Sequence, residues 1–148
     1  MYHAFMTFIS PLLHPGSRLR RQCLVLLTTL VVALLYLGSR PNISVIFPYL
    51  PWDKLVHATA YAGFASLAWV GLGGGSLTGP VVVAGVIGLL DEGMQYYSPG
   101  RTADIRDLVA DLVGATIIVL VLKWLQAAEE RRRLVPRVFT AISGKKNL

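Results

Sequence analysis

The chain of 148 residues is poor in charge and nearly free of cysteine. Charged side chains make up 15% of it, whereas soluble domains carry about 25%. The single cysteine, Cys23, excludes an intramolecular disulfide and a cysteine metal cluster. Apolar residues reach 54%. A length that suits one domain, the shortage of charge and several long apolar runs together predict an integral membrane protein.

Several motifs of soluble enzymes are also missing. There is no Gly-x-Ser-x-Gly elbow for a nucleophilic serine. The glycines in 71–75 are not followed by Lys-Ser or Lys-Thr, so they indicate a turn rather than a phosphate-binding loop. Cys23 and His57 are expected on opposite sides of the membrane, which excludes a Cys-His pair. The basic C-terminal end lacks the fold context of a nucleic-acid binder, so we expect membrane lipid as a partner and no nucleic acid.

Four apolar segments predict an all-α membrane protein built as a bundle of four transmembrane helices. No Ala-x-Ala cleavage pattern follows the first run, so we expect it to be a retained span rather than a signal peptide. The predicted spans are 22–38, about 55–72, about 80–97, and 102 or 103 to about 125.

Three segments follow from these spans: an N-terminal cytoplasmic or interfacial segment (1–21), a four-helix transmembrane domain (22–125) and a basic C-terminal tail (126–148). Residues 1–16 are expected either as a short helix at the interface or as a loosely ordered tail. The proline- and aromatic-rich connector 39–52 suits the headgroup level. The basic tail either lies against anionic lipid or is solvated.

The distribution of basic residues predicts the orientation of the bundle. Of the 14 lysines and arginines, ten lie on the side of the two termini and four on the opposite side. Cytoplasmic loops carry the excess of positive charge, so we expect both termini in the cytoplasm.

The stretch 88–114 holds five of the chain's eight acidic residues, although apolar runs flank it on both sides. Acids in such a place are costly unless they face protein, water or a partner. Asp104, Asp107 and Asp111 follow one another at i, i+3 and i+7, which puts all three on one face of the fourth helix. This pattern predicts a polar site.

The second and third helices bring further polar residues to the same end of the bundle. Asp91 and Gln95 are four residues apart, with Glu92 beside them, and Asp53 and His57 have the same spacing, with Lys54 between them. Since the chain direction alternates, packing should gather all three groups into one polar mouth that opens outward.

Charge balance at this mouth leaves its chemistry open. Six acids face only Lys54, Arg101 and Arg106, and carboxylates at low dielectric resist ionising together. Some of them must therefore share protons, bind a cation or meet a cationic ligand. One interpretation is Mg²⁺ or Ca²⁺ held by Asp91, Glu92 and the acids of the fourth helix, Asp107 in particular. The favoured interpretation is neutralisation by the three basic residues, without a metal cofactor.

The ordered motifs DKLVHATAY (53–61), DEGMQYY (91–97) and PGRTADIRDLVADLVG (99–114) resemble the VanZ-like family of small bacterial integral membrane proteins. The resemblance covers about residues 50–120 and implies a multi-pass protein of the bacterial cytoplasmic (inner) membrane. It also implies an envelope role related to antibiotic resistance, since the founding member is associated with teicoplanin resistance. Two positions depart from the pattern: Asp111 replaces a usual Asn, and Ile117 and Ile118 stand where a glycine often occurs.

Three functions remain open at this stage. The favoured one is binding of an envelope lipid, a lipid-linked wall precursor or an envelope-active compound. The others are an enzyme acting on lipid-linked envelope substrates, with His57, Asp91 and Glu92 as candidate catalytic residues, and a proton or cation relay. The expected ligand-binding residues are Asp53, Lys54, His57, Asp91, Glu92, Gln95, Arg101, Asp104, Asp107 and Asp111.

Overall fold

A computed structural model describes residues 2–40 and 52–144, with side chains from Phe5 to Leu134 except Thr7 and the connector. All regular structure in these ranges is helical, which confirms the all-α prediction. The helices are α1 (Tyr2–Leu13), α2 (Ser17–Gly38), α3 (Trp52–Gly71), α4 (Thr78–Tyr97) and α5 (Ile105–Gly144). The connector predicted at the headgroup level lies mostly outside the described residues.

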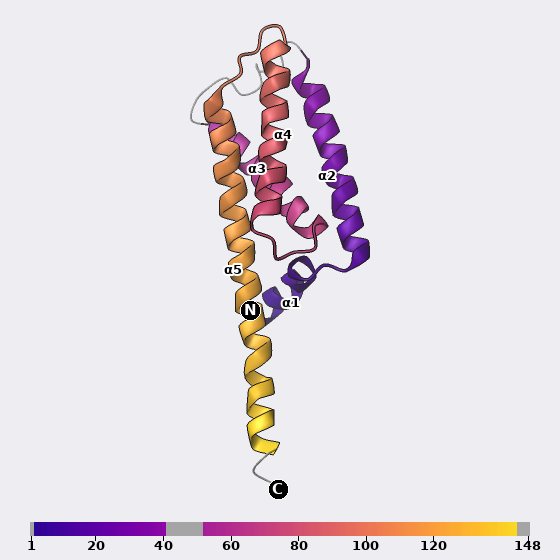
Figure 1. The fold of residues 1–148 in the computed structure, drawn as a ribbon, viewed down its shortest axis with the longest axis vertical. Coiled ribbons are helices and arrows are strands. Elements are labelled where there is room, and N and C mark those ends of the chain that lie inside the picture. The colour runs from indigo at the N-terminus through magenta and orange to yellow at the C-terminus, as the bar shows by residue number, and fades with distance from the viewer. Residues whose placement is uncertain (1, 41–51, 145–148) are drawn as a thin grey trace.

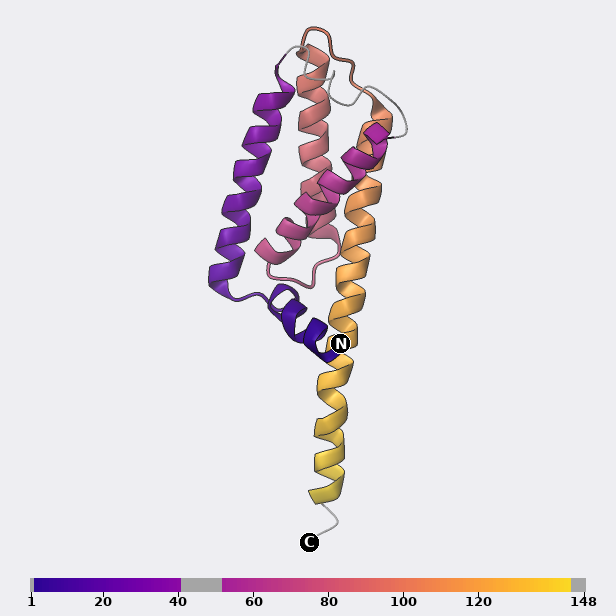
Figure 2. The same ribbon diagram turned by 180° about the vertical axis from the view of Figure 1, so that it is seen from behind.

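Helices α2 to α5 form an up-and-down bundle, and α1 packs against α5 at the end where both termini lie (Figure 1). Helix α3 crosses the bundle obliquely between its neighbours, as the opposite view shows (Figure 2), and makes its most extensive contacts with α5. The common end of the two termini agrees with an even number of crossings.

Two of the four predicted spans are long and apolar enough to cross a membrane by composition: Ser17–Gly38 and Ile105–Leu134, among the described residues. Helices α3 and α4 each have 20 residues. Their apolar character is diluted by the acids, the amide and the histidine of the predicted mouth and by glycine. The expectation of four spans therefore finds direct support in α2 and α5 alone.

Helix α5 is longer than predicted. It begins at Ile105, after a turn in which Gly100 has φ 77°, and it continues through the basic segment to Gly144. The sequence placed its end near residue 125, because apolar residues stop there. Loss of hydrophobicity does not end a helix, however, and the Ala, Glu and Arg residues that follow are strong helix formers.

The core lies along α3. Tyr61, Ala65 and Trp69 are at most 1% exposed and pack against Ala84 of α4 and Ala115 of α5. Ala58 of α3 touches Gly114 of α5 so closely with its backbone that no Cβ fits between them. Small residues at this crossing let the two backbones meet.

At the end that holds both termini, side chains of α5 donate hydrogen bonds to backbone carbonyls of neighbouring segments. Gln126 Nε2 donates to the Leu13 carbonyl at 3.1 Å, and Lys123 Nζ donates to the Gly75 carbonyl at 3.2 Å. The turn between α3 and α4 needs glycine, since Gly74 has φ 73° and a Cβ there would lie 2.8 Å from the Leu13 carbonyl oxygen. These contacts hold α1 as a helix against the bundle, which favours the helix over the loosely ordered tail among the two expectations for 1–16.

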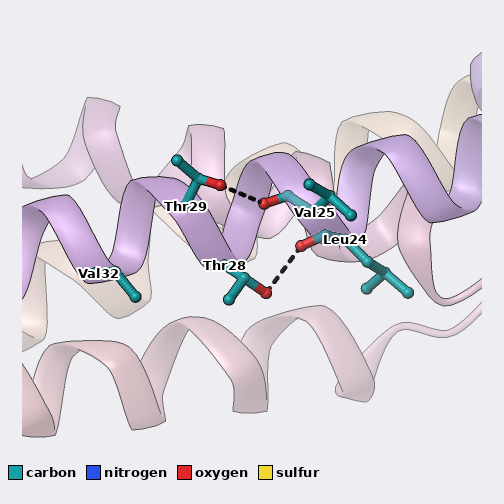
Figure 3. Close-up of a pocket in the computed structure, with 5 residues that line it drawn as sticks. All are labelled: Leu24, Val25, Thr28, Thr29 and Val32. Carbon is teal, nitrogen blue, oxygen red and sulfur yellow. Dashed lines mark hydrogen bonds between the residues drawn. The ribbon is translucent and has the colours of Figure 1, made fainter.

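An open groove of about 460 Å³ runs along α2 and carries no charged side chain (Figure 3). It is lined by Leu24, Val25, Thr28, Thr29 and Val32. Both threonine hydroxyls donate to carbonyls of their own helix, four residues back, at 2.9 Å. With its hydroxyls satisfied, this face offers only apolar contacts and no group for acid–base chemistry or ion binding.

Candidate functional site

The polar residues predicted to converge come from three helix ends that meet opposite the termini: the start of α3, the end of α4 and the start of α5 (Figures 1 and 2). The end of α2 joins them through Gly38, where a Cβ would lie 3.0 Å from Asp91 Oδ1. We call this cluster of polar residues the mouth. Its members are Asp53, Lys54, His57, Tyr61, Asp91, Glu92, Gln95, Arg101, Asp104, Asp107 and Asp111.

Lys54 is the centre of the outer part of the mouth. Its Nζ lies 3.3 Å from Asp53 Oδ2 and 3.1 Å from Asp104 Oδ2, and it also pairs with Asp107. The side chains of Asp53 and Asp104 are 35% and 36% exposed, whereas that of Asp107 is only 8% exposed. The Lys54 ammonium thus links the start of α3 to Asp104 at the rim and to Asp107 in the interior.

His57 forms the inner part of the mouth with Asp111. Nδ1 of His57 lies 3.0 Å from Asp111 Oδ1, and the Asp111 side chain is 1% exposed. Tyr61, one helical turn further along α3, stacks on His57 with ring centroids 6.1 Å apart and an angle of 8° between the planes. The carboxylate and the ring fix the orientation of the imidazole.

Helix α4 contributes a buried carboxylate with an amide partner. Gln95 Nε2 donates to Asp91 Oδ2 at 3.2 Å, and both residues are 4% exposed. This is the i, i+4 contact that their spacing predicts.

The loop before α5 is tied to α4 through Glu92, whose Oε2 accepts the backbone N–H of Asp104 at 2.7 Å. Asp104 in turn accepts the backbone N–H of Arg106 at 2.9 Å. That hydrogen bond and the Lys54 ammonium hold the pKa of Asp104 below its usual range. The Asp104 carboxylate is therefore a fixed negative charge at the rim.

The two arginines expected to neutralise the acids, Arg101 and Arg106, form no ion pair with the described acids of the mouth. Arg101 Nη1 donates to the Gly38 carbonyl at 3.3 Å, which ties the loop to the end of α2. Neither Arg101 nor Arg106 lies within ion-pair distance of a described carboxylate. Among the described residues, Lys54 is the one lysine or arginine whose side chain forms ion pairs with acids of the mouth.

Three buried polar atoms of the mouth have no hydrogen-bond partner: the Tyr61 hydroxyl, Glu92 Oε1 and Asp111 Oδ2. A buried polar atom without a partner costs about 1–3 kcal/mol, and more when it is charged. The sequence reasoning missed Tyr61. Its signal was its position four residues after His57, which places it on the same face of α3.

Comparison with known proteins places this chain within a described family. The family model VanZ/LLP1 matches residues 24–126, which contain every residue of the mouth. No curated protein and no solved structure matches the chain significantly.

Proposed function

The chain belongs to the VanZ/LLP1 family, and we propose that it binds the cationic headgroup of an envelope amphiphile at the mouth, as a VanZ-type membrane protein without turnover. The proposal places four spans in a bacterial cytoplasmic membrane, with both termini in the cytoplasm and the mouth on the outer face. Chain direction and the excess of basic residues beside the termini support this orientation.

The single observation that carries the proposal is the unbalanced charge of the mouth. Six carboxylates gather there, and Lys54 pairs with three of them: Asp53, Asp104 and Asp107. Asp91, Glu92 and Asp111 therefore have no lysine or arginine among the described residues as a partner, and two of these carry the unpartnered oxygens described above. A ligand that brings positive charge and N–H donors would satisfy these oxygens, whereas an anionic headgroup would be repelled.

A primary ammonium on a membrane-anchored molecule fits this surface. Such groups occur on aminophospholipids, on amine-bearing wall precursors and on cationic envelope-active compounds, and we propose this class as the ligand. Lys54 shows that the carboxylates already converge on one ammonium group. The exposed acids of the rim, Asp53 and Asp104, attract the headgroup first, and Glu92 Oε1 accepts its N–H.

The test uses the full chain in nanodiscs and measures lipid binding by native mass spectrometry. Phosphatidylethanolamine carries the ammonium, and phosphatidylglycerol serves as the anionic comparison. The variant Glu92→Gln removes one charge and keeps an oxygen that can accept the Asp104 N–H. Losing one charge-assisted hydrogen bond should weaken binding of the amine lipid by roughly 10- to 100-fold.

The matched control is Glu130→Gln, an exposed acid at the other end of α5. It should leave the binding unchanged. Equal affinity of the wild type for the two lipids, or equal losses in the two variants, would contradict the proposal.

The oriented imidazole favours a second candidate, an enzyme acting on lipid-linked envelope substrates. A histidine held by a buried carboxylate, as His57 is by Asp111, is typical of a general base. Replacing His57 by Gln would abolish turnover almost completely in an enzyme. In a binding protein the same change weakens binding of the amine lipid by a graded amount, so the two functions separate in one experiment.

A further inference from the structure

We propose that Asp53, His57 and Asp107 form a site for a first-row divalent metal ion of the Zn²⁺ or Mn²⁺ kind, with Asp111 as the residue that orients the histidine. This site differs from the cation set that the sequence offered only as the alternative to neutralisation, Asp91, Glu92 and Asp107. It goes beyond headgroup binding and does not depend on it, because the ion would belong to the protein itself.

The spacing of the donor atoms supports the proposal. One nitrogen of His57 and one carboxylate oxygen each of Asp53 and Asp107 all lie within 4.8 Å of one another. Zinc binds histidine nitrogen and carboxylate oxygen at about 2.0–2.2 Å, so donor atoms around one ion lie roughly 3–4 Å apart. A shift of each carboxylate oxygen by about 1 Å would bring the three donor atoms to this spacing.

His57 has the carboxylate hydrogen-bond partner that a metal-bound histidine usually has. Metal-ligating histidines usually donate their second ring nitrogen to a carboxylate, which fixes the tautomer and the direction of the ring. Asp111 Oδ1 holds Nδ1 of His57 at 3.0 Å, so Nε2 is the nitrogen available to an ion. Imidazole among the ligands favours Zn²⁺ over Mg²⁺ and Ca²⁺, which take oxygen ligands, and the two carboxylates of the set also suit Mn²⁺.

A second observation comes from two fully buried side chains that both contact His57. Asp111 is 0% exposed and its Oδ2 has no partner, and Tyr61 is 1% exposed and its hydroxyl has no partner. A cation on His57 offsets the charge of Asp111, and water bound to the cation supplies the missing donors.

Lys54 is the internal competitor of the ion, because its ammonium pairs with both carboxylates of the set. It also lies 3.1 Å from Asp104, so its flexible stem allows it to remain paired at the rim when an ion takes Asp53 and Asp107. The ion would enter from the rim, since exposure falls from 35% for the Asp53 side chain to 15% for His57 and 8% for Asp107.

The experiment loads the full chain, purified in detergent and stripped with a chelator, with Zn²⁺ or Mn²⁺ alone. Calorimetry should give one ion per chain, and Mg²⁺ should not compete at equal concentration. The variants His57→Ala and Asp107→Asn should each weaken binding by at least tenfold, and Asp111→Asn by about 10- to 100-fold. Removing the competitor with Lys54→Met should strengthen binding.

The matched control is His14→Ala, which removes the histidine that lies 3.5 Å from Glu129 at the opposite end. It should not change the affinity. Electron–nuclear double resonance of the Mn²⁺-loaded wild type should show coupling to one imidazole nitrogen, a readout that needs no variant to fold.

Lack of a stoichiometric ion, lack of the nitrogen coupling, or loss of binding in His14→Ala would overturn the metal site. Amine-lipid binding measured on the chelator-treated protein separates the two proposals. If the wild type binds no metal but still binds the amine lipid, and Glu92→Gln weakens that lipid binding, the metal site is overturned and the proposed function stands.

Discussion

Adding one methyl group at Gly114 should separate the two helices that build the mouth. A Cβ at this position would touch the Ala58 backbone, at 2.6 Å from the carbonyl carbon and 2.7 Å from Cα. Ordinary contacts between such atoms begin near 3.4 Å. Because the obstacle is backbone rather than a flexible side chain, and the Ala58 carbonyl oxygen lies closer still, α3 and α5 must move apart by more than ~1 Å.

The energy follows from the packing. Overfilling a tight contact costs about 1–3 kcal/mol. At about 2 kcal/mol the ratio of folded to unfolded protein falls roughly 30-fold, and the melting temperature falls by roughly 4–8 °C. Ala58 is next to His57, so the same shift stretches the 3.0 Å contact between His57 and Asp111 beyond hydrogen-bond length. Gly114→Ala should therefore weaken both folding and function.

The measurement is thermal unfolding of the full chain in detergent, followed by tryptophan fluorescence. The matched control is Gly93→Ala on α4, where a Cβ meets nothing within 4 Å. That change should leave the melting temperature unchanged or raise it, since alanine favours a helix over glycine by about 1 kcal/mol. Equal melting temperatures for Gly114→Ala and Gly93→Ala would refute the reasoning.

Three further changes probe the rest of the molecule. Gln126→Leu leaves the buried Leu13 carbonyl without its donor, so the protein should lose about 1–3 kcal/mol of stability, measurable by chemical unfolding; an unchanged midpoint would contradict this. The depressed pKa of Asp104 means that its pairing with Lys54 stabilises the fold above the unfolded pKa of about 3.9 and is lost as the pH falls through the lower native value. The stability difference between the wild type and Asp104→Asn should accordingly vanish in strong acid, and a difference that grows there would be the wrong sign. Thr102→Cys, in a chain without the native cysteine, should react with an impermeant maleimide on intact cells; labelling only after lysis would reverse the proposed orientation.

Long apolar runs predicted the helices, and helical spacing predicted which polar side chains share a face. The i, i+3, i+7 spacing of Asp104, Asp107 and Asp111 placed three acids on one face, and the structure brings the last two inward, at 6% and 0% exposure. Helix starts and ends near glycine and proline were also predictable to within a few residues, because those residues stop a helix by their backbone geometry.

The partners within the mouth could not be predicted. Charge counting treats Arg101 as a neutralising cation, but the carbonyl of Gly38, at the end of α2, accepts one of its N–H groups. Which basic residue reaches the acids depends on how α3 crosses α5, and that crossing is set by the fit of Ala58 against Gly114. The pairing of Asp111 with His57 depends on the same crossing, so spacing along one helix gave no access to it.

The length of α5 has a mechanical consequence. Its 40 residues span about 60 Å, roughly twice the thickness of the hydrocarbon layer. Asp107 stands at one extremity of this rod and the basic segment at the other. A tilt of α5 by about 5°, caused by a ligand bound at Asp107, would move the C-terminal end of the helix by about 5 Å, because a straight helix moves as a rigid body. In the proposed orientation, α5 would carry such a displacement from the outer mouth to the cytoplasmic end of the helix.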